Sequence, residues 1–274
     1  MVSSTKSSPF STKQLLVTAL VALAAGSTQA AGAKNATSAV NHASFGKITS
    51  GSGKCITGDP TTYVTREDMD WVWKNTMTKE VTGFNNLIFD QVVNNKGHLN
   101  YCVRWDTNKK LTKAAASKFQ AMLERQINVW NRWLAGYNCW PYDKINISVV
   151  GFAVRDKYIM DWDDDSLGTI YEGILDNEGS PKCPDECYKH LPAPIPADAR
   201  RVWVDDMLKD IDQAELYVLL HEMGHGFGLP EMYVDENKPA GFPECVMDMG
   251  FEMTDADGWL LRSIYENVKS RYNF

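Results

Sequence analysis

The chain has 274 residues, 44% of them hydrophobic, and a formal net charge of −7 at pH 7. This length is enough for one or two domains, and the apolar fraction can supply a substantial core. The acidic balance argues against nucleic acid as a partner, because binding to phosphates requires a basic surface.

The N-terminus has the organisation of a secretory signal. Lys6 and Lys13 precede an apolar run at residues 15–25, and small residues follow around Ala30. Such a pattern is typical of a signal peptide, and the run is short for crossing a bilayer. We expect residues 1–30 to be removed and the mature protein to be secreted and extracellular, with no stable membrane insertion. An uncleaved anchor is the alternative.

The next segment, residues 31–54, is rich in Ala, Ser, Gly, Thr and Asn. This composition is typical of a flexible leader or a short propeptide. We therefore assign residues 55–274 to a single domain. Asn35 and Asn146 occupy N-glycosylation sequons, so we expect a glycoprotein if the secretory route is eukaryotic.

Aromatic residues leave a second kind of partner open. The chain contains nine tryptophans, and most are expected in the core. If Trp71 and Trp73 are exposed, their faces can stack on sugar rings, which would allow polysaccharide binding.

Four segments between residues 99 and 204 have clear periodicity. Residues 99–105 alternate like a strand, and residues 145–154 and 201–204 are also strand-like runs. Between them, residues 111–135 repeat apolar side chains at helical spacing. The predicted order is strand, long helix, strands.

An acidic stretch follows the strand-like run at residues 145–154. Asp161, Asp163, Asp165 and Glu172 stand at positions 1, 3, 5 and 12 of an EF-hand-like loop. Ser166 occupies the turn position that normally requires glycine, so Ca2+ is only weakly supported there. A solvated loop or the rim of a substrate cleft is the favoured interpretation.

The cysteines all follow the predicted signal, and their number is even. An even count in a secreted chain predicts disulfides, here three. Cys183 and Cys187 are the favoured local pair, and with His190 nearby they could alternatively hold a structural metal. The six candidates are Cys55, Cys102, Cys139, Cys183, Cys187 and Cys245.

The most informative segment reads H-E-M-G-H-G-F-G-L-P-E, at residues 221–231. Asp212 and Glu215 form a capping-box-like start for a helix through this motif. On that helix His221 and His225 lie on one face, so both imidazoles can reach one cation. Glu222 then stands beside the cation and can act as a general base.

The residues after the second histidine predict a reversal of the chain. Gly228 can adopt a left-handed conformation that ends the helix, and Pro230 prevents its continuation. Glu231 can then turn back towards the histidines as a third ligand. Asp235 and Glu236 are the substitute ligands.

This motif resembles the extended zinc signature of the metzincin metallopeptidases, H-E-x-x-H-x-x-G-x-x-H/D. Its Gly-Leu-Pro segment is similar to matrixins, and the segment from Glu231 to Tyr233 is similar to the snapalysin-like branch. Glutamate as the third ligand departs from both patterns. The resemblance implies one catalytic Zn2+ held by His221, His225 and Glu231, with Glu222 as base. It also implies that Tyr233 donates a hydrogen bond to the oxyanion.

The resemblance continues downstream of the motif. The segment from Glu244 to Gly250 resembles the metzincin Met-turn, with Met247 as the first choice for its methionine and Met249 as the reserve. Thr254 then begins a capped C-terminal helix. A matrixin-like inhibitory role for Cys55 is disfavoured, because its sequence context fits poorly.

The fold that the resemblance implies is α+β. It is a metzincin-like mixed twisted sheet with a backing helix and an active-site helix, followed by a Met-turn and a C-terminal helix. We expect a monomeric, secreted zinc endopeptidase that acts on a protein or peptide substrate. The alternatives are a carbohydrate-binding or structural protein with a non-catalytic metal site, and a zinc hydrolase of a non-peptide bond.

Overall fold

The computed structural model describes residues 55–60, 63–184, 187 and 202–274. Contacts divide the chain into Met1–Ser38 and Ala39–Phe274, and every described residue belongs to the second unit. The predicted signal, the predicted leader, Asn35 and His190 lie outside the described residues.

The sheet consists of three strands in the order β1-β2-β3, which are β1 (His98–Trp105), β2 (Asn146–Val154) and β3 (Thr169–Glu172). The predictions of strands at 99–105 and 145–154 are confirmed. Both strand pairings are parallel, so in the described part of the chain the sheet is not the mixed one expected. Asn146 is exposed at the start of β2.

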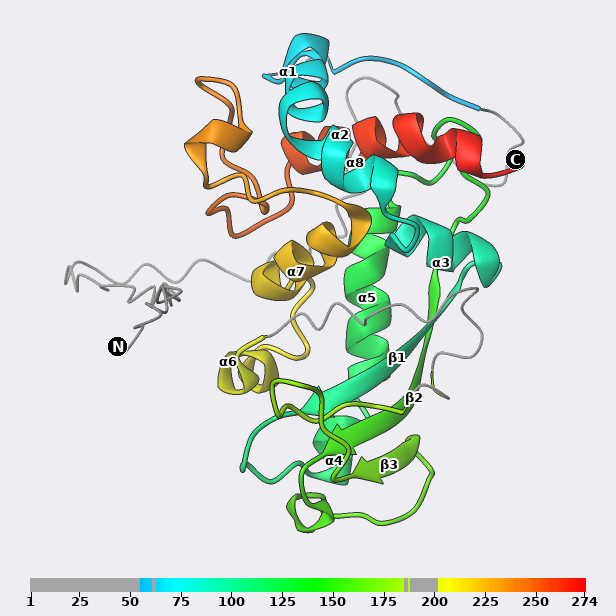
Figure 1. The fold of residues 1–274 in the computed structure, drawn as a ribbon, viewed down its shortest axis with the longest axis vertical. Helices are drawn as coiled ribbons and strands as arrows, with labels where there is room; N and C mark the ends of the chain where they lie inside the picture. The colour runs from blue at the N-terminus through cyan, green and yellow to red at the C-terminus, as the bar shows by residue number, and fades with distance from the viewer. Residues whose placement is uncertain (1–54, 61–62, 185–186, 188–201) are drawn as a thin grey trace, which may run out of the picture. The chain divides into compact units, whose positions relative to one another are not determined.

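The helices account for most of the remaining regular structure, so the chain is a mixed α and β protein (Figure 1). Three short 3-10 turns are η2 (Lys157–Ile159), η4 (Asp235–Asn237) and η5 (Lys269–Arg271). The helices are α1 (Arg66–Val72), the π-helical turn η1 (Trp73–Met77), α2 (Thr78–Gly83), α3 (Ile88–Asn94), α4 (Lys113–Ala116), α5 (Phe119–Asn131), α6 (Val204–Lys209), α7 (Tyr217–Phe227) and α8 (Asp255–Val268).

The long helix predicted at 111–135 is interrupted after α4. Ser117 Oγ donates to the Ala114 carbonyl at 2.8 Å, a local bond that competes with the helical ladder. The longer part, α5, connects β1 to β2 and packs against β2 on one side and α7 on the other. Trp130 Nε1 donates to the Leu220 carbonyl at 3.0 Å and so ties α5 to α7. Helix α5 is therefore the backing helix of the site.

Two predictions about secondary structure are wrong: one strand and the start of one helix. Of the strand expected at 201–204, residues 202 and 203 are not in a strand, and Val204 begins α6 because Met207 and Leu208 pack against the core at helical spacing. Helix α7 starts at Tyr217 rather than after Asp212. The expected capping residues have other partners, since Asp212 pairs with Lys118 and Glu215 pairs with Arg132.

The C-terminal helix is confirmed with its predicted start. The Thr254 side chain and the Asp257 carboxylate form a capping box at the first turn of α8. Arg262 on this helix is buried against the rings of Tyr137 and Trp259, with its guanidinium 4.4 and 4.8 Å from their centroids. Helix α8 is thus part of the core and not a surface appendage.

The two tryptophans considered for sugar stacking are less exposed than that role assumed. Trp71 and Trp73 are partly buried and pack against the hydrophobic core. The exposed tryptophan among the described residues is Trp203, which is 76% exposed at the start of α6. None of the helices in the described residues is long and apolar enough to cross a bilayer.

The disulfides differ from the predicted set. Cys55 pairs with Cys139 and Cys102 pairs with Cys183, while Cys187 and Cys245 are free thiols. The predicted Cys183–Cys187 bridge is therefore wrong, and so is the count of three. Because Cys55 is bonded to Cys139, it does not act as a ligand for a metal elsewhere.

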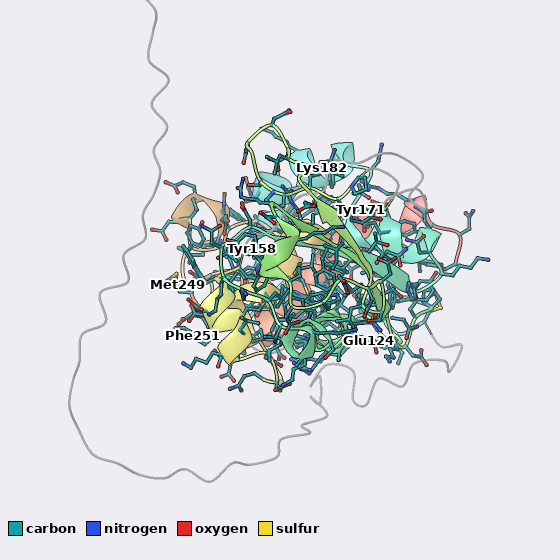
Figure 2. The ribbon with its side chains drawn as sticks, turned by 90° about the horizontal axis from the view of Figure 1, so that it is seen from below. Glu124, Tyr158, Tyr171, Lys182, Met249 and Phe251 are labelled. Carbon is teal, nitrogen blue, oxygen red and sulfur yellow. A yellow bond between two sulfur atoms is a disulfide. The ribbon has the colours of Figure 1, made fainter. Side chains whose placement is uncertain are left out.

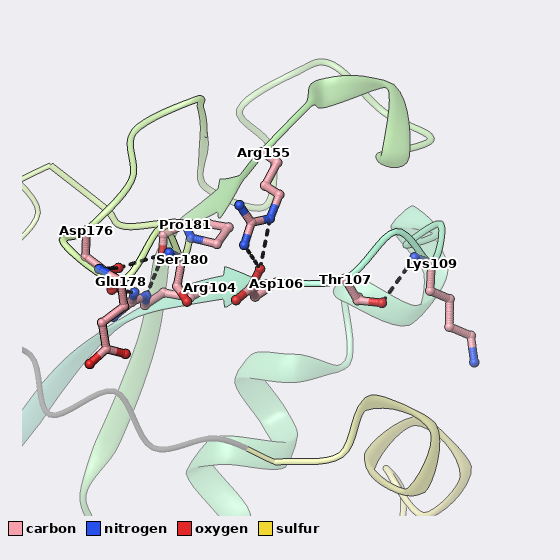
Figure 3. A network of polar contacts seen from close by, with 9 residues as sticks. All are labelled: Arg104, Asp106, Thr107, Lys109, Arg155, Asp176, Glu178, Ser180 and Pro181. Carbon is pink, nitrogen blue, oxygen red and sulfur yellow. Dashed lines mark hydrogen bonds and ion pairs between the residues drawn. The ribbon is translucent and has the colours of Figure 1, made fainter. Parts of the chain in front are cut away.

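Contacts across the sheet explain the pairing of Cys102 with Cys183. The chain after β3 returns to β1, where Arg104 forms an ion pair with Asp176 and donates to the Pro181 carbonyl (Figure 3). This brings the residues that follow Pro181 to Cys102 on β1. A long-range contact therefore decides a pairing for which the sequence favoured the nearest neighbour.

The acidic loop does not gather its carboxylates. Asp161 accepts from the Lys113 backbone nitrogen, Asp164 pairs with the Lys113 side chain, and Glu172 accepts from the Lys157 backbone nitrogen. Among the described residues, the groups with metal-ligand spacing do not include this loop. The carboxylates of this loop are therefore exposed and have separate partners.

Candidate metal centre

The site is built on α7, which is amphipathic. Leu220, Met223 and Phe227 are buried, whereas His221 and His225 are only partly buried. Side chains four residues apart lie on the same face of a helix. The core side of α7 thereby fixes where both imidazoles emerge.

The helix ends as the glycine predicted. Gly228 has a φ of +99°, and its N–H and that of Leu229 donate back to the carbonyls of His225 and Gly224 at 2.8 and 3.1 Å. This is a Schellman motif, which favours glycine at the left-handed position. A Cβ on Gly228 would also lie 2.9 Å from the Val81 side chain. The reversal carries the chain from the second histidine towards Glu231.

Glu231 meets both histidines after this reversal. Its two carboxylate oxygens lie 3.1 Å from His221 Nε2 and 3.1 Å from His225 Nε2. The two Nε2 atoms are themselves 3.1 Å apart. The substitutes considered from sequence, Asp235 and Glu236, are exposed on η4 and are not part of this cluster.

The other nitrogen of each imidazole faces a backbone carbonyl. His221 Nδ1 lies 2.8 Å from the Val246 oxygen, and His225 Nδ1 lies 2.8 Å from the Leu229 oxygen. Because a carbonyl oxygen can only accept, the neutral imidazoles carry their hydrogen on Nδ1. Both Nε2 lone pairs are then directed at the same point, as in histidines that bind a metal.

The electrostatics of the cluster favour positive charge at this point. Burial by itself lowers the pKa of His221, but the Glu231 carboxylate and the Val246 carbonyl raise it above its usual value. Burial would raise the pKa of Glu231, yet the two imidazoles hold it well below its usual range. Glu231 Oε2 is also buried and receives no hydrogen bond. When the histidines are neutral, this oxygen and His221 Nε2 are two hydrogen-bond acceptors 3.1 Å apart, with no hydrogen between them.

Two further polar side chains stand at the edge of this cluster. The Tyr233 ring is stacked on His221 at a centroid distance of 6.4 Å. Burial, followed by the charges of Glu231 and Glu222, raises the pKa of Tyr233. The charge of Glu222 also contributes to the raised pKa of His221. Glu222 is only partly buried and thus accessible to water.

Residues 245–250, which we call turn 245–250, lie under the histidines. Met247 is fully buried, and a Cβ on Gly224 of α7 would overlap its sulfur. The Met247 carbonyl accepts from the Met232 nitrogen at 2.8 Å, next to Glu231. Met249, by contrast, is 63% exposed and lies at the surface (Figure 2). Of the two methionines, Met247 is therefore the one that packs beneath α7.

Asp257 secures this turn from below. Its carboxylate accepts from the backbone nitrogens of Val246 and Met247 at 3.1 and 3.3 Å, as well as from Thr254. No sequence pattern indicated that Asp257 supports this turn. The carbonyls of Val246 and Leu229 could not be found from sequence at all, because any residue type supplies a carbonyl.

The described residues contain one other group with metal-ligand spacing. The sulfurs of Cys102, Cys183 and Cys187 lie within 4.8 Å of one another. Two of them form a disulfide, so they cannot serve as thiolate ligands while it is intact. Only the histidine and glutamate cluster keeps three ligand atoms available.

The comparisons with known proteins add no relative. No protein-family model, curated protein or solved structure matches this chain.

Proposed function

We propose that this protein is a secreted zinc-dependent endopeptidase of the metzincin type, with His221, His225 and Glu231 as the metal ligands. The observation that carries the proposal is the convergence of three lone-pair donors about 3.1 Å apart on one point. Such an arrangement is unfavourable for neutral imidazoles and a carboxylate unless a cation lies between them.

The ligand set supports zinc in particular. Two imidazole nitrogens and one carboxylate oxygen form a ligand set of catalytic zinc sites, which leave a fourth position for water or substrate. Bound zinc supplies Lewis acidity, which polarises a substrate carbonyl and makes water acidic near neutral pH. The carbonyls behind His221 and His225 orient the rings for this purpose.

The remaining steps belong to residues of the chain. Glu222 removes the proton from the attacking water and returns it to the nitrogen of the leaving group, as general acid and base catalysis requires. The Tyr233 hydroxyl, whose ring is stacked on His221, donates to the oxyanion of the tetrahedral intermediate. The predicted secretory signal and the two disulfides support an extracellular setting.

The experiment is hydrolysis of casein by the purified, zinc-loaded protein beside its Glu222→Gln variant. We expect the variant to bind zinc normally and to lose about 100- to 10,000-fold of its activity. Glu67→Gln, which changes an exposed carboxylate on α1, is the matched control and should remain fully active. Equal activity of the wild type and Glu222→Gln would exclude the proposed base. A wild type that binds no zinc would exclude the proposed site.

The role of Tyr233 has a separate test. Tyr233→Phe removes only the hydroxyl, so zinc binding and stability should stay at wild-type values. Loss of one oxyanion donor lowers kcat by about 100- to 1,000-fold. An unchanged kcat in steady-state kinetics would show that Tyr233 is a packing residue.

A further inference from the structure

The third ligand lies on a loop, and this loop is attached to turn 245–250 at both of its ends. At its start, the Met232 nitrogen donates to the Met247 carbonyl at 2.8 Å. At its end, Lys238 Nζ lies 2.5 Å from Asp248 Oδ2. Inside the loop, Asn237 Nδ2 donates to the Glu231 carbonyl at 2.9 Å. The position of Glu231 therefore depends on how the loop is closed.

The ion pair at the end of the loop is sheltered from water. The side chains of Lys238 and Asp248 are 17% and 12% exposed, whereas those of the surface pair Lys118 and Asp212 are 49% and 72% exposed. Surface ion pairs contribute little, but removing one partner from a sheltered pair leaves a charge without compensation. The Lys238–Asp248 pair can accordingly hold a defined geometry.

Lys238 is one of the few cationic side chains in an acidic region of the chain. Residues 202–257 contain 14 carboxylate side chains and only two lysines, Lys209 and Lys238. Without the Lys238 cation, the sheltered Asp248 carboxylate would be uncompensated, and the attachment of the loop to turn 245–250 would weaken. This turn also provides the Val246 carbonyl that orients His221. One ion pair thus joins the segment of the third ligand to the support of the first.

We infer that Lys238 and Asp248 form a clasp that positions Glu231 against His221 and His225 and so sets the affinity of the site for its metal. The inference rests on the proposed function, because it concerns the same zinc site. Neither residue touches the substrate or the metal. Both are positioning residues.

The test is zinc affinity, measured by competition with a chromophoric chelator on the full purified protein. Lys238→Met and Asp248→Asn should each weaken zinc binding about 10- to 100-fold, as loss of an outer-sphere partner does. The double variant should bind zinc with about the affinity of the weaker-binding single variant, because both changes break the same contact. Lys238→Arg keeps the cation and should keep the affinity. Lys118→Met and Asp212→Asn are the matched controls without effect.

A second readout separates positioning from general stability. The thermal midpoint of the metal-free protein reports the general stability that the broken ion pair costs, while the visible spectrum of the Co2+ forms of the clasp variants should differ from the wild type because Glu231 is displaced. Wild-type affinity in Lys238→Met, additive losses in the double variant, or equal losses in Lys238→Arg and Lys238→Met would each overturn the clasp and leave the proposed function standing. A wild type that binds no zinc would overturn both.

Discussion

Among the described residues, two groups of three potential ligands have their ligand atoms within 4.8 Å of one another, yet they differ in what these atoms can still bind. In the histidine cluster, formed by His221, His225 and Glu231, three lone pairs face one another. In the cysteine cluster, formed by Cys102, Cys183 and Cys187, a disulfide has used two of the three sulfurs. Proximity alone therefore does not make a metal site, because a sulfur that is bonded in a disulfide is not available as a thiolate ligand.

The two groups also differ in their construction. Two ligands of the histidine cluster lie on one helix, and two backbone carbonyls fix their rings. The cysteine cluster joins β1 to the segment that follows β3, so it depends on long-range packing. The first group keeps three ligand atoms available, whereas the second forms a cross-link.

The largest expected effect follows from this difference. His225→Ala removes one of three ligands, and we expect the purified protein to lose its stoichiometric zinc. Cys187→Ser, which changes the free thiol of the cysteine cluster, should retain one zinc per chain. Metal analysis after dialysis measures both, and circular dichroism confirms that each variant is folded. Zinc that is lost with Cys187→Ser and kept with His225→Ala would assign the metal to the cysteine cluster instead.

The cross-linking role of the cysteine cluster predicts a stability effect. The double variant Cys102→Ser/Cys183→Ser removes a bridge between residues 81 positions apart. We expect the free energy of unfolding to fall by about 2–4 kcal/mol, because the unfolded chain gains freedom. Chemical denaturation of the metal-free protein provides the measurement. Unchanged stability would mean that the pair contributes no cross-link in solution.

The support beneath the histidines predicts a somewhat smaller effect. In Gly224→Ala the new methyl group would overlap the Met247 sulfur, so we expect a loss of about 1–3 kcal/mol. The matched control is Gly83→Ala in α2, where a Cβ meets nothing within 4 Å. Alanine in a helix should stabilise that site by about 0.5–1 kcal/mol. Thermal denaturation of both variants measures these effects. Wild-type stability of Gly224→Ala would contradict the packing of Gly224 against Met247.

The smallest effect is a count of thiols. The half-buried Cys187 should react with a thiol reagent in the native protein, whereas Cys245 is fully buried and should react only after unfolding. Burial, together with the neighbouring Asp257, raises the pKa of the Cys245 thiol and so further slows its reaction. The total should be two. A count of zero in denaturant would restore the three disulfides that the even number of cysteines predicted.

Local patterns predicted the elements that carry the site, but less of their boundaries. The alternation at 99–105 and 145–154 is that of β1 and β2, and Thr254 marks the start of α8. The start of α7 was predicted too early, because Asp212 and Glu215 form ion pairs with Lys118 and Arg132, the residues that flank α5, instead of capping the helix. A capping sequence predicts a cap only where no tertiary partner competes for its side chains.

By itself the sequence determined the histidine pair and the end of its helix, because helical spacing and a left-handed glycine are local properties. Only the tertiary structure decided between Glu231 and its neighbours, between Met247 and Met249, and between the cysteine pairings. These choices depend on Asp257, on the carbonyl of Val246 and on the return of the chain to β1. Such contacts join residues from separate elements, and folding alone brings them together.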